Sequence, residues 1–252
     1  RRTAHSGIRA LRHYCCHQHD CNIFDRHVAT RQKGKVMLAL TDITLNYEGR
    51  TILDNASLSV ARGEIVSLVG PSGSGKTTLL RVIAGLEQPS QGTVVIDNKL
   101  MTGIPTHKRD VGLVFQDNQL FPHLCVFDNI AYSLRVKRVS KALQIEKVNE
   151  MLSLIGMEDL ARRDVGQLSG GEAKRIAVAR ALVADPFILL LDEPLTGLDA
   201  ELRDRLLEDM GALLRARRTT VVHVTHDHNE ATRLSDRVVD VRTLGQSGVQ
   251  LQ

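Results

Sequence analysis

The feature that most constrains the fold of this chain is the stretch GPSGSGKTT at residues 70–78. It matches the phosphate-binding pattern G-x-x-x-x-G-K-[ST], and it lies between a strand-like apolar run at 64–69 and a helix-like run at 76–84. Glycines let a backbone curl around phosphate oxygens, and the amides at a helix N-terminus attract anions. This context argues against a glycine-rich turn that matches by chance. The sequence therefore predicts a nucleotide site.

The loop supplies the first set of candidate site residues. Lys76 is expected to reach the β- and γ-phosphates of a nucleotide, and the Thr77 hydroxyl is expected to ligate Mg²⁺. The predicted phosphate contacts are Gly70, Pro71, Ser72, Gly73, Ser74, Gly75, Lys76, Thr77 and Thr78.

A second phosphate-site signature is the run FILLLDE at 187–193. A buried parallel strand is a continuous apolar run, and functional groups gather at its carboxyl end. We expect Asp192 to hold Mg²⁺ and Glu193 to polarise the water that attacks the γ-phosphate. Strands that end in solvated acids are common in α/β proteins, but the pairing with the glycine-rich loop favours the functional interpretation.

A third feature is LSGGE at 168–172, followed by a helix-like run at 173–182. Taken alone, Ser169 would be an ordinary helix N-cap. Beside the other two features, the helix start becomes a second anion site, with Ser169 able to donate to a phosphate oxygen.

Together these elements resemble the ATP-binding subunits of ABC transporters, in the order of that family, from about residue 37 to 241. The resemblance implies ATP and Mg²⁺ as cofactors. It implies catalysis by Glu193 and His226 with Lys76, and metal contacts from Thr77, Gln116 and Asp192. The further cofactor contacts it implies are Tyr47 stacked on adenine, Gln116, Ser169, Gly170, Gly171, Glu172 and Asp199.

The departures from the family pattern are small. The signature ends in Glu172 where the family has Gln, and His228 stands where related importers often have Gln. Neither residue belongs to the groups expected to do the chemistry.

The resemblance and the patterns predict an α/β fold: a P-loop NTPase core with a mostly parallel sheet, an N-terminal antiparallel β subdomain and an inserted helical subdomain. The expected strands are 38–45, 56–60, 64–69, 92–96, 111–115, 187–193, 220–225 and 237–241, with a turn at 48–50. A helical pattern runs from 117 to about 166, and further helices are expected at 76–84 and 200–216.

Composition bears on partners and location. No apolar run approaches the length of about eighteen residues that spans a bilayer. If the chain serves transport, the pore belongs to membrane permease subunits, with a solute-binding protein outside the cytoplasm completing the assembly. The resemblance also implies a head-to-tail dimer that sandwiches two ATP molecules, bound peripherally at the cytoplasmic face of the inner membrane. The segment 119–124 (QLFPHL) resembles importer ATPases and favours uptake.

The net charge of +4 comes from the first 36 residues. They carry eight Lys and Arg and two Asp, a net of +6, so the remainder carries −2 and gives no argument for nucleic acid. We expect residues 1–36 to be a disordered basic tail and 37–252 to be the ATP-binding domain. A zinc site at Cys15, Cys16 and Cys21 is disfavoured by their cramped spacing, and a targeting role is the other alternative.

The rival function class is a soluble ABC-type ATPase that acts on DNA or the ribosome. Chromosome and repair ATPases of this kind insert a long coiled coil between the positions of Gln116 and Ser169. Here these residues are 53 positions apart, which leaves no room for one. The substrate contacts of a transporter lie in other chains, so the sequence does not name the solute.

Overall fold

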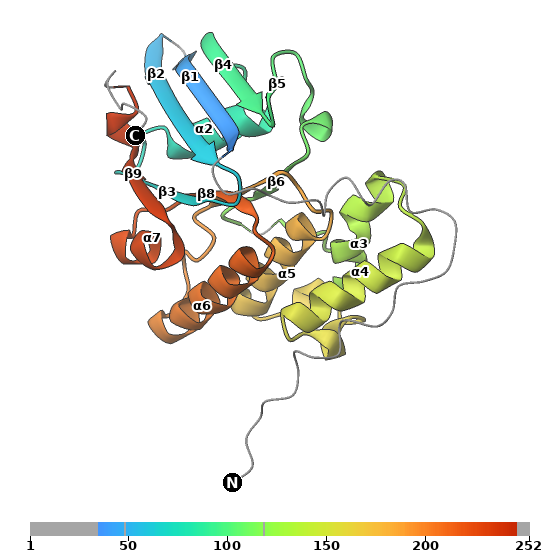
Figure 1. Cartoon of the computed structure of the whole chain (residues 1–252). Coiled ribbons are helices and arrows are strands. Elements are labelled where there is room, and N and C mark those ends of the chain that lie inside the picture. Colours follow the sequence, from blue (N-terminus) through green and yellow to red (C-terminus); the bar gives the residue numbers. More distant parts are fainter. Residues whose placement is uncertain (1–34, 48, 118, 246–252) are drawn as a thin grey trace. The chain divides into compact units, whose positions relative to one another are not determined.

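The computed structural model describes residues 35–47, 49–117 and 119–245 of this chain (Figure 1). The cysteines of the predicted tail and residue 48 of the predicted turn lie outside the described residues. The first strand begins at Val36, the last residue of the predicted tail.

The core of the chain is a five-stranded parallel sheet in the order β6-β7-β8-β3-β9. Its strands are β3 (Ile65–Val69), β6 (Val111–Val114), β7 (Ile188–Asp192), β8 (Thr220–Val224) and β9 (Arg237–Asp240). Every residue of β3, β7 and β8 is buried, as expected for central strands covered on both faces.

Alternate side chains of these strands belong to two different hydrophobic clusters, one on each face of the sheet. In β7, Ile188 and Leu190 pack into one cluster, and Leu189 and Leu191 pack into the other. Successive side chains of a strand point to opposite faces, so one strand serves both clusters. The sheet is therefore the middle layer of three.

One covering layer contains the antiparallel sheet, whose order is β2-β1-β4-β5. Its strands are β1 (Val36–Tyr47), β2 (Arg50–Ala61), β4 (Gln91–Ile96) and β5 (Lys99–Leu100). Helix α2 (Lys76–Ala84) lies between the two sheets, above the parallel one in the view of Figure 1. The predicted N-terminal antiparallel subdomain and the helix at 76–84 are confirmed.

The opposite face is covered by helices (Figure 1). They are α3 (Val126–Val136), α4 (Lys141–Leu154), α5 (Gly170–Leu182), α6 (Ala200–Ala216) and α7 (His228–Leu234). Short 3-10 turns lie at Thr106–Lys108, Glu158–Leu160, Val165–Gln167 and Val241–Thr243. Helices α3 and α4 stand between β6 and α5 in the chain, where the helical insertion was predicted. The α/β prediction, with its mostly parallel core sheet, is confirmed.

The helical pattern was predicted to begin at residue 117, but the first helix of the insertion, α3, begins at Val126. The preceding loop is fixed by the buried Asn129 instead. Its amide donates to the carbonyls of Phe121, Leu124 and Cys125 at 3.0–3.1 Å, and its Oδ1 accepts from the Phe121 amide at 2.8 Å. A single side chain thus replaces the backbone bonds that a helix would have made.

Arg109 holds the end of α2 from inside the protein. Its guanidinium donates to the carbonyls of Ile104, Val82, Ile83 and Met101 at 2.9–3.1 Å. Burial lowers the pKa of Arg109, and the carbonyls at the negative end of the helix oppose that cost.

Arg109→Met should lower the free energy of unfolding by about 3 kcal/mol, because it leaves several buried carbonyls without a donor. Urea unfolding curves measure this loss. Lys108→Met, an exposed neighbour in the same turn, is the matched control and should change the midpoint little. Equal midpoints for the two variants would contradict the role of Arg109.

Candidate functional site

The glycine-rich loop joins β3 to α2 at the edge of the parallel sheet. Gly73 and Gly75 have φ of +77° and +89°, a region that side chains with a Cβ disfavour. A Cβ on Gly75 would come within 2.8 Å of Leu53 Cδ2 on β2. The glycine at 75 therefore serves both the loop conformation and its close packing against the antiparallel sheet.

Lys76 begins α2 and points back into this loop. It is only 5% exposed, and its Nζ donates to the carbonyls of Gly70 and Pro71 at 2.8 and 2.9 Å. The ammonium group thus lies inside the curve of the loop, where an anion would meet it.

Thr77, at the start of α2, contacts Asp192, at the carboxyl end of β7. The Thr77 hydroxyl donates to Asp192 Oδ1 at 2.9 Å. Burial raises the pKa of Asp192, Glu193 raises it further, and the Thr77 bond and the cations of Arg81 and Lys76 oppose the rise. Two protein oxygens at this spacing fit Mg²⁺, which takes few protein ligands and shares the rest with phosphates and water. Among the described residues there is no group of three or more His, Cys, Asp and Glu side chains that could hold a metal ion.

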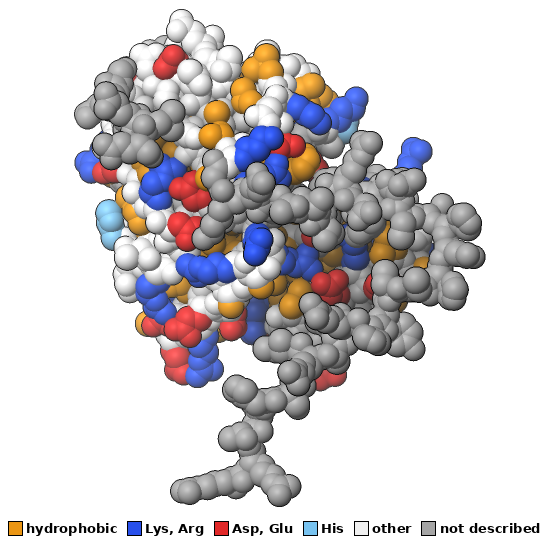
Figure 2. All heavy atoms as spheres, in the orientation of Figure 1, with side chains coloured by type: hydrophobic (Ala, Val, Ile, Leu, Met, Phe, Trp, Pro, Cys, Tyr) orange, Lys and Arg blue, Asp and Glu red, His pale blue; other side chains and the backbone are white. Residues whose placement is uncertain are grey.

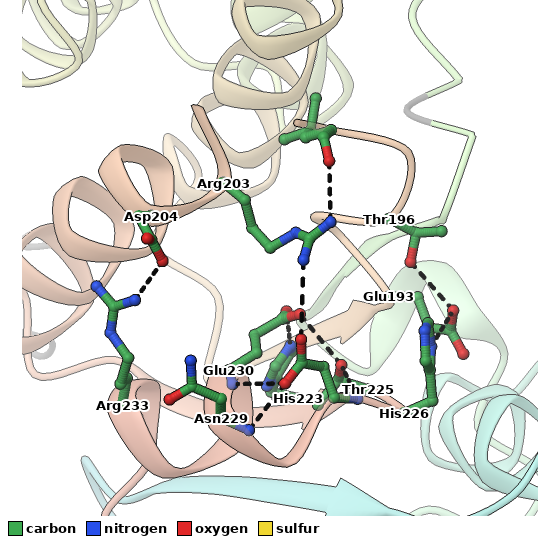
Figure 3. Close-up of polar contacts among 12 residues, drawn as sticks. Glu193, Thr196, Arg203, Asp204, His223, Thr225, His226, Asn229, Glu230 and Arg233 are labelled. Atoms are coloured by element: carbon green, nitrogen blue, oxygen red, sulfur yellow. Dashed lines mark hydrogen bonds and ion pairs between the residues drawn. The ribbon is translucent and has the colours of Figure 1, made fainter. Parts of the chain in front are cut away.

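Glu193 follows Asp192 directly and is held from two sides (Figure 3). His226 Nδ1 and Thr196 Oγ1 each lie 3.1 Å from Glu193 Oε2. The backbone of Glu193 has φ of +45°, and its amide donates to the Val224 carbonyl at 2.9 Å. Strained backbone of this kind persists where surrounding contacts fix it, and it gathers at functional sites.

The topology explains why these groups converge. Strands β3, β7 and β8 are parallel neighbours, so their carboxyl ends meet at one edge. Asp192 is the register partner of Val224, and Val224 is also the partner of Leu68. The loop, the acidic pair and His226 thereby come together from three separate parts of the sequence.

A cavity of about 460 Å³ opens beside this edge. It is lined by Gly70, Pro71, Ser72, Glu193, His226, His228, Asp240 and Arg242. The sequence analysis missed Asp240 and Arg242, because only the pairing of Val69 with Asp240 between β3 and β9 brings them to the loop. The bond from Arg242 lowers the pKa of Asp240 to about 2, so this carboxylate stays ionised.

Two other predicted residues lie at the ends of strands. Gln116 is exposed in the turn after β6, the neighbour of β7 in the sheet, so it stands at the same edge as Asp192. Tyr47 is the last residue of β1, paired with Arg50, and is 61% exposed. Its proposed contact with adenine stays a prediction.

The hydrogen bonds of the side chains in segment 169–172 are made within the segment itself. Ser169 Oγ accepts from the Glu172 amide at 3.3 Å, and Glu172 Oε2 accepts from the Ser169 amide at 2.7 Å. This is a capping box, and the bonds from Ser169 lower the pKa of Glu172. The glutamate therefore has a structural use at a position where the family has glutamine. Asp199 likewise caps α6 by accepting from the Leu202 amide at 2.9 Å.

Comparison with known proteins settles the family. A sequence profile described as "ABC transporter" matches residues 53–196, more than half of the chain. The chain belongs to the ABC transporter family. The resemblance read from the sequence is confirmed.

Curated members of the ABC transporter family match over most of this chain. The Fe(3+) ions import ATP-binding protein FbpC of Streptomyces coelicolor is 48% identical over 218 residues, which are 86% of this chain and 63% of that protein. The spermidine/putrescine import ATP-binding protein PotA of Thermotoga maritima is 47% identical over 201 residues, 80% of this chain and 55% of that protein. This chain therefore spans less than two thirds of the length of these relatives.

Solved ABC transporter cassettes share the fold. An ATP-binding cassette solved as a dimer, in a post-hydrolysis state bound to ADP and Pi, has a TM-score of 0.72 and 34% sequence identity. The match covers 81% of this chain and 94% of that one.

Proposed function

We propose that this chain is the ATP-binding and ATP-hydrolysing subunit of an ABC importer, and that it powers uptake of a small solute through a separate membrane permease. The observation that carries the proposal is the convergence of Lys76, the Thr77–Asp192 pair and the Glu193–His226 pair at one edge of the parallel sheet. The names of the curated relatives, which are import ATP-binding proteins, support the same activity.

The chain's own residues divide the chemistry among them. Lys76 and the loop amides bind and orient the β- and γ-phosphates. Mg²⁺, bound through Thr77 and Asp192 with Gln116 nearby, would neutralise charge on those phosphates. His226 and Thr196 hold Glu193 Oε2, which leaves Oε1 to accept a hydrogen bond from the attacking water. Catalysis of this kind depends on positioning and on electrostatic stabilisation more than on covalent steps.

We expect the signature segment to act on the nucleotide of a second copy of the chain. Within the described part of the chain, Ser169 and Glu172 are bonded to each other and not to the loop at 70–78. In a head-to-tail dimer, Ser169 and Gly171 of the partner would close over the nucleotide that Lys76 holds. The dimeric state of the solved cassette supports this arrangement.

Ser169→Arg should prevent ATP-dependent dimerisation while ATP binding by the single chain remains. A large cation at the exposed start of α5 would block the composite site. Size-exclusion chromatography with and without ATP measures the effect, and Ser153→Arg, at an exposed serine of α4, is the control for a large cation away from α5. A Ser169→Arg protein that dimerises with ATP as the wild type does would contradict the sandwich arrangement.

The transport assembly follows from the proposed activity. No helix in the described part of the chain is long and apolar enough to cross a membrane. We propose that the permease subunits carry the pathway, that a solute-binding protein outside the cytoplasm delivers the solute, and that this chain binds at the cytoplasmic face of the inner membrane. The relatives named for iron import and for polyamine import serve different solutes, so their names do not identify the solute of this chain.

The rival function, a soluble ATPase on DNA or the ribosome, has less support. The described part of the insertion between β6 and α5 holds the short helices α3 and α4 and two 3-10 turns, and it contains no coiled coil. Acidic and basic side chains are interspersed over the described part of the face in Figure 2, without one broad basic patch. Nucleic-acid sites are typically clustered Lys and Arg surfaces.

The purified chain should hydrolyse ATP in a reaction that needs Mg²⁺, and it should co-purify with permease subunits from the membrane. Phosphate release with Mg²⁺ and with EDTA measures the first, and affinity capture after detergent extraction measures the second. Capture of ribosomes or DNA without any membrane protein would favour the rival function.

A further inference from the structure

Lys174 is a buried lysine that the proposed chemistry does not use. It lies in the second turn of α5, two residues after the signature segment, and is only 7% exposed. Its Nζ donates to the carbonyl of Thr196 at 2.6 Å. Burial lowers the pKa of Lys174, the charge of Glu230 opposes this, and Arg203 adds to the lowering. A buried ammonium is costly, so its retention at this place points to a specific contact.

The Thr196 carbonyl belongs to the turn that holds Glu193. Thr196 Oγ1 donates to Glu193 Oε2 at 3.1 Å, and the Thr196 amide donates to the Glu193 carbonyl at 3.3 Å (Figure 3). Lys174 therefore fixes the backbone of the residue whose side chain orients the proposed catalytic carboxylate. Glu193 itself sits in a left-handed conformation that needs such support.

A second cation completes the attachment of this turn. Arg203 on α6 donates to the Leu198 carbonyl at 2.9 Å and lies 3.8 Å from Asp227, which caps α7 after His226. The loop at 196–199 is thus held by α5 at one end and by α6 at the other.

The start of α5 also packs on this loop and, more tightly, on the first turn of α6. A Cβ on Gly171 would come within 2.9 Å of Leu202 Cδ2, and one on Gly170 would lie 3.8 Å from Leu198 Cδ2. These contacts connect the signature segment, the loop at 196–199 and Glu193 into one continuous set. Lys174, which follows the signature segment on α5, supplies the hydrogen bond to the loop.

We propose that Lys174 is a positioning residue that ties the signature helix to Glu193 of the same chain through the Thr196 turn. The inference rests on the proposed function. In the proposed dimer, the signature segment of a chain closes over the partner's nucleotide, while its own Glu193 serves its own nucleotide. A shift of α5 on closure would then reach Glu193 through Lys174 and the Thr196 turn.

The test compares Lys174→Met with Lys174→Arg in the full chain. Met approximates the apolar stem of the lysine side chain and lacks the donor, whereas Arg keeps both a cation and a donor. We expect kcat for ATP hydrolysis to fall about tenfold in Lys174→Met with the dissociation constant for ATP within about twofold, because positioning of Glu193 acts on the transition state. Lys174→Arg should restore most of the rate. Lys99→Met, an exposed lysine of β5, is the matched control and should behave as the wild type.

A pairwise test locates the path. Thr196→Val removes the hydroxyl bond to Glu193 but keeps the backbone carbonyl. If Lys174 acts through Thr196, the fold-loss of rate in the Lys174→Met and Thr196→Val double variant should be smaller than the product of the two single fold-losses. Lys174→Leu, which also lacks a donor, serves as a second single variant if Met impairs folding.

The outcomes separate the inference from the function on which it rests. A wild-type rate in Lys174→Met contradicts the inference and leaves the proposed function intact. Weakened ATP binding together with a lower melting temperature, not restored by Arg, would show a structural role and would also overturn it. A wild-type chain that hydrolyses no ATP contradicts the proposed function and removes the inference with it.

Discussion

Glu193→Gln should bind ATP normally and hydrolyse it about a thousandfold more slowly, the loss expected when a general base is removed. The amide oxygen can still accept from His226 and Thr196 at the positions that Oε2 now occupies, so the geometry of the site survives. Only the capacity to polarise and deprotonate water is lost. Single-turnover phosphate release measures the rate, and titration calorimetry measures the affinity.

The same variant should accumulate as an ATP-bound dimer, because hydrolysis is the step that would reopen it. Size-exclusion chromatography with ATP detects the dimer. Glu201→Gln, an exposed residue of α6 paired with Arg205, is the matched control and should change neither rate nor oligomeric state. A Glu193→Gln protein that remains monomeric at high concentration, with or without its permease, would count against the two-copy mechanism.

Lys76→Ala should weaken ATP binding about a hundredfold, which corresponds to ~2.7 kcal/mol. The substitution removes a side-chain cation that bonds the inside of the glycine-rich loop, and with it the two bonds to Gly70 and Pro71 that brace the loop. Both losses act in the same direction, since a phosphate group would meet a less positive and a less ordered cradle.

Calorimetry with ATP and Mg²⁺ measures the affinity of Lys76→Ala, and circular dichroism checks that the variant is folded. Lys99→Ala on the exposed strand β5 is the control for loss of one positive charge. An unchanged dissociation constant in a folded Lys76→Ala protein would refute the assignment of the phosphate site.

Local patterns predicted much of this protein. The helices at 76–84 and 200–216 coincide with α2 and α6, and neighbouring residues mark one end of each: α2 ends at Gly85, which has φ of +80°, and α6 begins after its N-cap Asp199. The run at 187–193 predicted β7, since a continuous apolar segment in an α/β protein needs cover on both faces. The motifs and the family resemblance also predicted the loop at 70–78, Asp192, Glu193 and His226, which the structure brings to one edge of the sheet, and their roles stay predictions.

The helical insertion shows where local pattern failed. Residues 119–125 have no helix, since Asn129 binds the carbonyls of Phe121, Leu124 and Cys125 from the next element along the chain. Helix propensities summed along the chain do not include hydrogen bonds from one buried side-chain amide to several backbone carbonyls of a loop.

The sequence by itself determined the motifs and the strand and helix periods, because these depend on residues that are neighbours along the chain. The tertiary structure alone decided which side chains meet. The register of β3 with β9 brings Asp240 and Arg242 to the glycine-rich loop, and the packing of α5 on the turn after β7 places Lys174 on the Thr196 carbonyl. Contacts between residues so far apart in the chain follow from strand order and helix packing, which no local pattern contains.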